Sequence, residues 1–226
     1  MNQLTIIILF ILLQACQVAP HTYTPIRIEN GGIKIDGSHD EKSWTRAERI
    51  TTFQNPWENT INPATSLSMM RDSQFLYFYF EVADEEVILD PDFSKEDDVV
   101  KEDRVELFFS KDKDMGTYYC FEMDPKGRTL AYAAKHYRKV NFDWDAPQGF
   151  NIAARQFSGG YAVEGAIPMA FIQELEKDSA VYFGTYRAEF SKQEGVTVEN
   201  WLTWVDPKTE KPDFHVPTSM GKLYLK

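Results

Sequence analysis

The sequence has only two cysteines, Cys16 and Cys120, among its 226 residues. Two cysteines cannot build a disulfide framework, so the hydrophobic core must hold the protein together. Cys120 lies in the alternating run Tyr118–Met123, which is typical of a strand, and we expect it to be a small buried side chain. Cysteine-dependent catalysis is therefore disfavoured.

Basic residues are also scarce. Lysine and arginine number 24 against 35 aspartates and glutamates, which gives a formal net charge of −11. Because proteins that bind nucleic acid neutralise phosphates with a basic surface, no nucleic-acid partner is expected. The acidic balance also disfavours anionic polysaccharides, unless the fold creates a local basic patch.

Long hydrophobic runs and familiar catalytic motifs are missing as well. The apolar run Ile6–Leu13 has eight residues, whereas a membrane-spanning helix needs about 20. The chain contains no His-x-x-x-His pair, no Gly-x-Ser-x-Gly elbow and no phosphate-binding glycine loop. Metal hydrolases and serine hydrolases therefore lose support. Glycoside hydrolysis needs only two carboxylates and stays open, with Glu106 and Glu122 as the candidate pair.

The apolar run Ile6–Leu13 is followed directly by Gln14, Ala15 and Cys16. A short apolar core of this kind is typical of a secretory signal peptide, and a cysteine after Ala15 resembles a bacterial lipobox, where that cysteine is acylated. We therefore predict a signal peptide over residues 1–15, then a lipidated Cys16 and polar tether over residues 16–25. The alternatives are a signal peptide cut elsewhere and a buried N-terminal strand. Lipidation would anchor the protein in the cell envelope, and we expect the outer membrane, on its surface or its periplasmic face.

Hydrophobic residues after the tether recur mostly with a period of two, which predicts strands. The expected strands are Gly32–Ile35, Leu67–Arg71, Phe75–Val82, Arg104–Phe109, Tyr118–Met123, Thr129–Ala134, Asn151–Phe157, Tyr161–Ile167, Tyr182–Phe190, Trp201–Trp204 and Lys222–Leu225. Helical signals are few: a turn or two around Asp40–Glu48, and one helix from Pro168 to about Leu175. This pattern predicts one all-β domain over residues 26–226, an antiparallel, jelly-roll-like β-sandwich with one or two short helices.

Four segments of the chain, taken in order, resemble one known family. They are Ile33–Gly37 with Asp40, Glu41 and Trp44; Asp103–Phe109; Gly159–Glu164 with Ala166–Pro168; and Asp213–Pro217 with Gly221–Leu223. Together they are similar to the carbohydrate-binding module family 9 type of domain. The resemblance implies a β-sandwich that binds sugars such as xylan without hydrolysing them, carried on xylanases or on cell-surface lipoproteins. It also implies a glycoside hydrolase as a candidate partner, and structural calcium.

The resemblance transfers the family's sugar site only in part. In the xylan-binding type, two tryptophan rings sandwich the sugar, and carboxylate, arginine and asparagine side chains bind its hydroxyls. The first ring falls on Val100 and the second on Phe214, while the acid is kept as Glu106. The arginine and asparagine fall on Glu122 and Asp124, so two hydrogen-bond donors have become acceptors. Either the ligand differs from xylan or cellulose ends, or the pocket has been lost.

An aromatic ring can cover the apolar face of a pyranose, while carboxylates and amides bind its hydroxyls. This chemistry makes Phe214 and Glu106 candidates for sugar contact. Each has an ordinary structural alternative, because Phe214 could be a core residue and Glu106 could be a buried partner of Arg104 or Arg187.

The five tryptophans divide into two groups by their surroundings. Trp57 and Trp144 lie in polar loops without alternation, so either could supply the missing ring of the sugar site. Trp44, Trp201 and Trp204 fall at framework positions of the resemblance, and we expect them to pack in the core.

Acidic residues concentrate between Glu81 and Asp114, where 14 acids face 5 bases. A run of this kind is most often a solvated loop, and the sharper interpretation is a calcium site, because calcium takes six to eight oxygen ligands. The run is not an EF-hand, since Asp90-Pro91-Asp92 is not followed by glycine and Lys101 stands at the twelfth position.

The sequence therefore predicts a membrane-anchored, non-catalytic carbohydrate-binding protein that holds polysaccharide or oligosaccharide near the cell. Two alternatives stay open. One is a glycoside hydrolase, and the other is a structural or protein-interaction sandwich with a lost sugar pocket.

Overall fold

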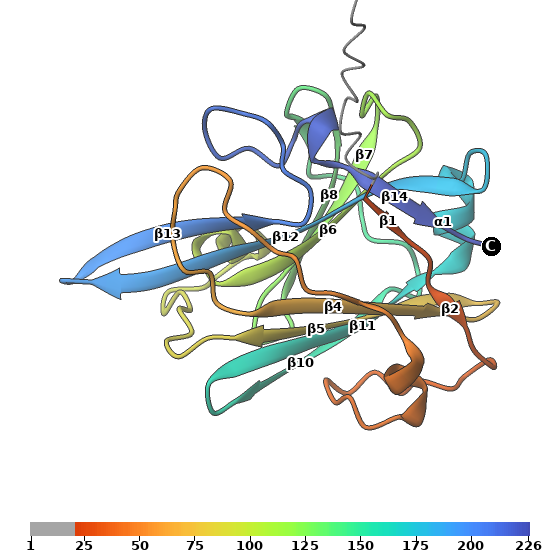
Figure 1. Cartoon of the computed structure of the whole chain (residues 1–226), viewed down its shortest axis with the longest axis horizontal. Coiled ribbons are helices and arrows are strands. Elements are labelled where there is room, and N and C mark those ends of the chain that lie inside the picture. The colour runs from red at the N-terminus through yellow and green to blue at the C-terminus, as the bar shows by residue number, and fades with distance from the viewer. Residues whose placement is uncertain (1–20) are drawn as a thin grey trace, which may run out of the picture.

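The computed structural model describes residues 21–226, so the predicted signal peptide, Cys16 and the first part of the tether lie outside the described residues. Within residues 21–226, none of the helices has the length and apolar character needed to cross a membrane. The described chain consists mainly of strands, arranged in two sheets that stack face to face (Figure 1). The predicted all-β sandwich is confirmed.

The larger sheet has eight strands. In spatial order they are β1 (Thr22–Tyr23), β14 (Gly221–Tyr224), β12 (Ala180–Gln193), β6 (Arg104–Ser110), β7 (Tyr118–Met123), β8 (Thr129–Lys135) and β9 (Lys139–Asn141), with β13 (Val196–Thr203) also paired to β12. The pairs are antiparallel except for β1 with β14, which is parallel. The hairpin of β12 and β13 projects from one end of the sandwich (Figure 1).

The smaller sheet has six strands. They are β10 (Asn151–Phe157), β11 (Gly160–Pro168), β5 (Phe75–Ala83), β4 (Thr65–Arg71) and β2 (Ile26–Arg27), with β3 (Arg49–Ile50) also paired to β4. The helical elements are α1 (Met169–Leu175), which follows Pro168 as predicted, and the 3-10 turns Lys42–Arg46, Glu96–Lys101 and Pro217–Ser219.

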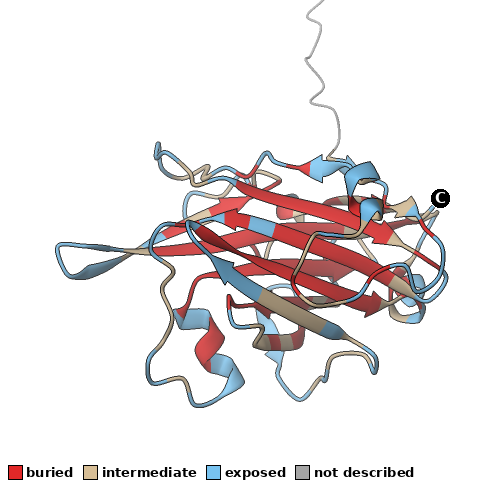
Figure 2. Ribbon diagram, turned by 90° about the horizontal axis from the view of Figure 1, so that it is seen from below, coloured by how far each residue is buried: buried red, intermediate tan, exposed pale blue. Residues whose placement is uncertain are grey.

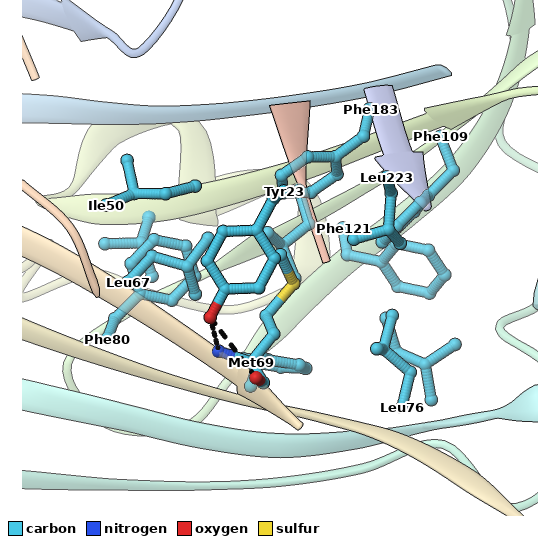
Figure 3. Close-up of a cluster of buried hydrophobic side chains, with 14 of the residues drawn as sticks. Tyr23, Ile50, Leu67, Met69, Leu76, Phe80, Phe109, Phe121, Phe183 and Leu223 are labelled. Atoms are coloured by element: carbon cyan, nitrogen blue, oxygen red, sulfur yellow. Dashed lines mark hydrogen bonds between the residues drawn. The ribbon is translucent and has the colours of Figure 1, made fainter. Parts of the chain in front are cut away.

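A hydrophobic core lies between the sheets (Figure 3). Strand β5 sends Leu76, Phe78 and Phe80 into it and turns the side chains between them outward, as the period of two requires. Tyr23 also enters this core, and its hydroxyl accepts a hydrogen bond of 2.8 Å from the backbone N–H of Met69. The predicted tether over residues 16–25 is therefore corrected for Thr22 and Tyr23, which belong to the sheet as β1, while residues 16–20 lie outside the described residues.

Most predicted strands are present, and the exceptions have physical causes. No strand forms at Gly32–Ile35, because Ile33 packs on the outer face of the smaller sheet instead of pairing in a ladder. Strand β13 begins at Val196, well before the predicted Trp201, since its first half pairs with β12 outside the core. Strands β1, β2, β3 and β9 have two or three residues each, which is too short for alternation to be visible.

Residues 28–47 cover the outer face of the smaller sheet, and we call this segment the cover. Ile28, Ile33 and Trp44 of the cover pack against side chains of the sheet that include Tyr77 and Tyr79. This second apolar layer explains why β5 is hydrophobic on both faces. Figure 2 shows the central strands as buried and the loops and hairpin tip as exposed.

A buried carboxylate fixes the cover in place. Glu164 of β11 accepts hydrogen bonds from the backbone N–H groups of Asp36 and Gly37, at 2.9 and 3.0 Å. Gly37 has a φ of +79°, and a Cβ there would lie 3.1 Å from the backbone of Ala154. Only glycine fits this turn without strain.

Candidate functional site

A cavity of about 410 Å³ opens on the outer face of the larger sheet. We call it the cup. Its inner part is lined by Arg104, Glu106, Glu122, Tyr132, Trp201 and Phe214. Around its mouth lie Val100, Arg138, Val140, Phe142, Asp213 and His215.

Strand alternation places the cup's carboxylates. On β6, Val105 and Leu107 face the core between the sheets, so Glu106 between them points outward. Glu122 of β7 lies directly opposite Glu106 in the register, and therefore points to the same side. The two acids thus lie next to each other on the outer face of the larger sheet.

Arg104 holds the two acids together, and we call Arg104, Glu106 and Glu122 the floor of the cup. Its Nε donates to Glu106 Oε1 at 3.0 Å and to Glu122 Oε2 at 2.8 Å. The hydroxyl of Tyr132 donates to Glu122 Oε1 at 2.7 Å. The exposed fraction of each floor residue is 5% or less, so the floor is a desolvated charged network.

The floor combines two acids with a single guanidinium, and this alters proton binding. Burial and then the charge of Glu122 raise the pKa of Glu106 to about 8, although Arg104 opposes the rise. Burial likewise raises the pKa of Tyr132 far above its usual range, so its hydroxyl stays a donor. The floor can therefore retain a proton near neutral pH.

Aromatic rings form the walls of the cup. Trp201 and Phe214 meet edge to face with their centroids 5.7 Å apart, and Phe214 stacks on Tyr186 at 4.3 Å. The guanidinium of Arg104 lies 5.4 Å from the Trp201 ring. Phe142 stands at the mouth with 60% of its surface exposed. These rings offer apolar faces beside a charged floor.

A second ion pair, between Arg138 and Asp213, lies at the mouth of the cup. Arg138 donates to Asp213 Oδ1 at 2.8 Å, and the Tyr137 hydroxyl donates to Asp213 Oδ2 at 2.8 Å. His215 forms a hydrogen bond of 2.9 Å between its Nδ1 and the Tyr118 hydroxyl. Burial and then the Arg138 charge lower the pKa of His215 to about 3, so the imidazole is neutral in the working pH range.

The structure brings together three of the six residues predicted from the sequence, Glu106, Glu122 and Phe214. Val100, where the first family ring falls, also lies at the mouth. The structural alternatives hold as well, since Phe214 is only 4% exposed and Glu106 is paired with Arg104. Burial in the core and contact with the cup are compatible for both side chains.

The other three predicted residues lie outside the cup. Asp124 is fully buried in the turn after β7, where it accepts from the backbone N–H of Lys126 at 2.8 Å and pairs with Arg128. Trp57 packs on Phe214 from outside, and its indole N–H donates to the Thr209 carbonyl at 3.0 Å.

Trp144 belongs to the rim of the main core. It packs against Tyr119 and Phe121 at centroid distances of 4.8 and 5.8 Å, and it lines a separate cavity beside Phe142 and Ile152. Neither Trp144 nor Trp57 therefore replaces the missing ring in the cup. Trp44 and Trp204 are buried as predicted.

Several cup residues were not found from the sequence as site residues, among them Trp201, Tyr132, Arg138 and Phe142. Trp201 packs against a core cluster as expected, but it is only half-buried and also lines the cup. Tyr132 could have been found from its position, since β8 follows β7 with the same alternation. Arg138 and Phe142 lie in the turn and loop on either side of β9, where no periodicity guides a prediction.

The acidic run Glu81–Asp114 does not fit calcium. Its buried carboxylates already accept from donors of the chain: Asp103 from the backbone N–H groups of Ile88 and Phe190, at 2.5 and 2.6 Å, and Glu102 from Arg128 at 2.6 Å. Within residues 21–226, there is no group of three or more histidine, cysteine or acidic side chains suited to a metal ion. Oxygens that face N–H donors are not free to ligate a hard cation.

Comparisons with known proteins agree on one kind of domain. The family model described as "Carbohydrate family 9 binding domain-like" matches residues 35–226. A protein from Bacteroides uniformis to which carbohydrate binding is ascribed superposes with a TM-score of 0.70 at 15% identity, covering 92% of this chain and 100% of its own. No curated protein matches the sequence.

Two further solved structures are of a carbohydrate binding module family 9 from Caldicellulosiruptor kristjanssonii. The complex with cellotriose has a TM-score of 0.61 at 19% identity, covering 89% of this chain and 93% of that one. The complex with glucose has a TM-score of 0.57 at 19% identity, covering 91% and 96%. At these identities the likeness shows the fold alone.

Proposed function

Because the chain belongs to the carbohydrate family 9 binding domain-like family, we propose that the cup is its saccharide-binding site and that it binds without cleaving. Membership of this family supports non-catalytic sugar binding in general. The assignment to the cup depends on one observation, which is that aromatic walls and a hydrogen-bonding charged floor meet in a single cavity.

Each part of the cup suits one part of a pyranose. The faces of Trp201 and Phe214 can pack on the apolar C–H face of the ring. Glu106 and Glu122 can accept hydrogen bonds from hydroxyls, and the neutral imidazole of His215 lies nearby without adding charge.

The mouth of the cup supports a ligand longer than one sugar. Four of the large hydrophobic side chains that are exposed in the described chain gather there: Val100, Tyr137, Val140 and Phe142, with exposed fractions of 44, 53, 38 and 60%. Three of them line the cavity, and Tyr137 is bonded to Asp213 of its rim. Exposed apolar groups gathered at a cavity favour ligand contact.

The position of the two acids argues against hydrolysis. A glycosidase places its carboxylates on either side of the scissile bond. Glu106 and Glu122 are direct neighbours on one face of one sheet, and Arg104 bonds both through the same nitrogen. A hydrolase is the second candidate, and it requires release of reducing sugar that disappears in Glu106→Gln or Glu122→Gln.

A glycan array followed by calorimetry on the purified protein tests the binding proposal. Oligosaccharides such as cellotriose or xylotriose should bind, and Trp201→Ala should weaken the binding without unfolding the protein. Trp144→Ala is the matched control, because Trp144 lies outside the cup and should leave affinity unchanged. If no glycan binds, a structural or protein-interaction role replaces the proposal.

The envelope setting belongs to the same proposal. Cys16, with the lipobox-like residues before it, supports a lipid anchor on the outer membrane of a bacterium that uses polysaccharides such as xylan, with a partner glycoside hydrolase. Labelled fatty acid should enter the wild-type protein and should not enter Cys16→Ala, which should leave the membrane fraction. Wild-type protein that takes up no label would contradict the anchor.

A further inference from the structure

We propose that the cup prefers a sugar with a protonated amino group to the matching neutral sugar. This inference rests on the proposed function and names the class of its ligand. It follows from the unbalanced charge of the floor, from one carboxylate oxygen that has no donor among the described residues, and from the aromatic walls.

The charged groups of the cup do not balance. Arg104 and Arg138 face Glu106, Glu122 and Asp213, so the carboxylates exceed the guanidinium groups by one. At the mouth, Asp213 is matched by Arg138 and by the Tyr137 hydroxyl. When both acids are ionised, the excess negative charge therefore belongs to the floor, where two acids share Arg104.

One carboxylate oxygen of the floor, Glu106 Oε2, receives no hydrogen bond from the described residues. Glu106 is 1% exposed, and only its Oε1 is hydrogen-bonded, to Arg104; within residues 21–226 its Oε2 has no hydrogen-bond partner. Both carboxylate oxygens of Glu122 are used, one by Arg104 and one by Tyr132. Glu106 lines the cup, and its Oε2 is not among the polar atoms that the chain encloses completely, so a ligand that brings a donor to this atom adds a hydrogen bond that the protein does not supply.

Groups from every neighbouring element act on Glu106. They are Arg104 on its own strand, Glu122 on β7, Tyr132 on β8, Arg138 between β8 and β9, and Asp213 and His215 in the segment after β13. Tyr132 keeps its proton and His215 is neutral, so they add no charge. Burial and Glu122 favour a proton on Glu106, and an ammonium group of the ligand would take that proton's place.

The walls favour a cation as well. Aromatic faces carry negative charge density, and a cation within about 6 Å of a ring centroid is attracted to it. Trp201 already has the Arg104 guanidinium at 5.4 Å, while Phe214 has no such partner among the described residues. A neutral sugar gains only stacking from these rings. An amino sugar gains stacking and a charge-assisted hydrogen bond.

Calorimetry with three sugars that differ only at one carbon tests the inference: D-glucosamine, N-acetyl-D-glucosamine and D-glucose. At about pH 6 a sugar amine carries its proton. We expect glucosamine to bind about tenfold more tightly than the other two, since a close charge pair is worth at least that factor. Repeating the titration in buffers of different ionisation enthalpy should show proton release with glucosamine and none with glucose.

Glu106→Gln keeps the shape and removes the negative charge that Glu106 gains when the ammonium group displaces its proton, so it should bring the glucosamine-to-glucose affinity ratio close to one. Glu174→Gln, an exposed change on α1, is the control and should keep the ratio. If Glu106→Gln does not fold, the wild-type protein still tests the inference, because binding of glucosamine should release a proton and binding of glucose should not.

Equal affinity for glucose and glucosamine, or tighter binding of the N-acetyl sugar, would overturn the inference and leave the proposed function standing. If none of these sugars binds while another glycan of the array does, the inference fails and the proposed function stands. If no glycan binds, the proposed function fails together with the inference.

Discussion

The two sheets differ most in what lies on their outer faces. The smaller sheet is covered by its own chain, with Trp44 and Ile33 packed on Tyr77 and Tyr79. The larger sheet carries an equally aromatic outer layer, which includes Phe108, Tyr132, Tyr186 and Phe214, but the segments over it leave a cavity of about 410 Å³. The chain thus covers the outer face of the smaller sheet completely enough to form a second core, whereas it leaves part of the aromatic layer on the larger sheet open as the cup.

The buried carboxylates differ in access. Glu164 on the covered face accepts from two backbone N–H groups of the cover, both through Oε2, and its buried Oε1 has no hydrogen-bond partner among residues 21–226. Glu106 on the open face also has a donor for only one of its oxygens, but it lines the cup. Each acid thus keeps one oxygen without a donor, and a ligand can reach only the one that faces the cavity.

Removing the main anchor of the cover should have the largest effect. Trp44 is 2% exposed, so Trp44→Ala leaves a large cavity beneath the cover and should lower the free energy of unfolding by about 3–5 kcal/mol. Urea denaturation measures this loss. Sugar affinity, measured well below the unfolding midpoint, should stay at the wild-type value, and a parallel loss of affinity would show that the two faces are coupled.

The same change on the open face should reverse the pattern. Trp201→Ala removes a wall of the cup from a half-buried position, and should weaken sugar binding by about 1–3 kcal/mol. Its free energy of unfolding should fall by less than that of Trp44→Ala. Calorimetry measures the affinity of both variants, and urea denaturation measures their stability. The expected contrast between the two faces is contradicted if Trp201→Ala lowers stability as much as Trp44→Ala does and leaves sugar affinity unchanged.

The pH dependence of stability should separate Glu164 from exposed acids. Burial raises the pKa of Glu164 from 4.5 to about 7, so the folded state holds a proton that the unfolded chain releases. This stabilisation is present at low pH and is lost as the pH rises from 4.5 to about 7. The difference in unfolding free energy between wild type and Glu164→Gln should therefore change by up to roughly 3 kcal/mol across that window. Glu174→Gln should show no such change.

A smaller effect is expected at the mouth of the cup. Phe142 is 60% exposed, so Phe142→Ala should leave stability and monosaccharide affinity unchanged. Affinity for a trisaccharide should fall by about 0.5–1 kcal/mol if the second sugar stacks there. Equal loss for both ligands would place Phe142 beside the first sugar instead.

Chelation should have the smallest effect. Since the buried acids of Glu81–Asp114 accept from N–H donors of the chain, adding EDTA should move the unfolding temperature by less than about 1 °C. A larger drop that calcium reverses would mean that a cation replaces some of these donors.

The sequence was sufficient for the sandwich and for part of the cup. Glu106 and Glu122 were predictable because alternation on β6 and β7 sets their direction, and pairing then puts them side by side. Trp201 packs against a core cluster as expected, and its second role in the wall of the cup was missed because a strand pattern does not tell which end of a sheet is covered. Arg138 and Phe142 were missed because loops around a three-residue strand carry no periodic signal.

The position of β1 has a consequence for the order of folding. Thr22 pairs with Lys222 and Tyr23 with Leu223, so the edge of the larger sheet joins the two extremes of the described chain. Closing such a long loop costs more entropy than forming the hairpins β4–β5, β6–β7 and β10–β11, whose strands are neighbours in sequence. The hairpins can therefore form early and the β1–β14 pairing last. Tyr23, whose hydroxyl is bonded to Met69 in the core, would then be the side chain whose burial reports that folding is complete.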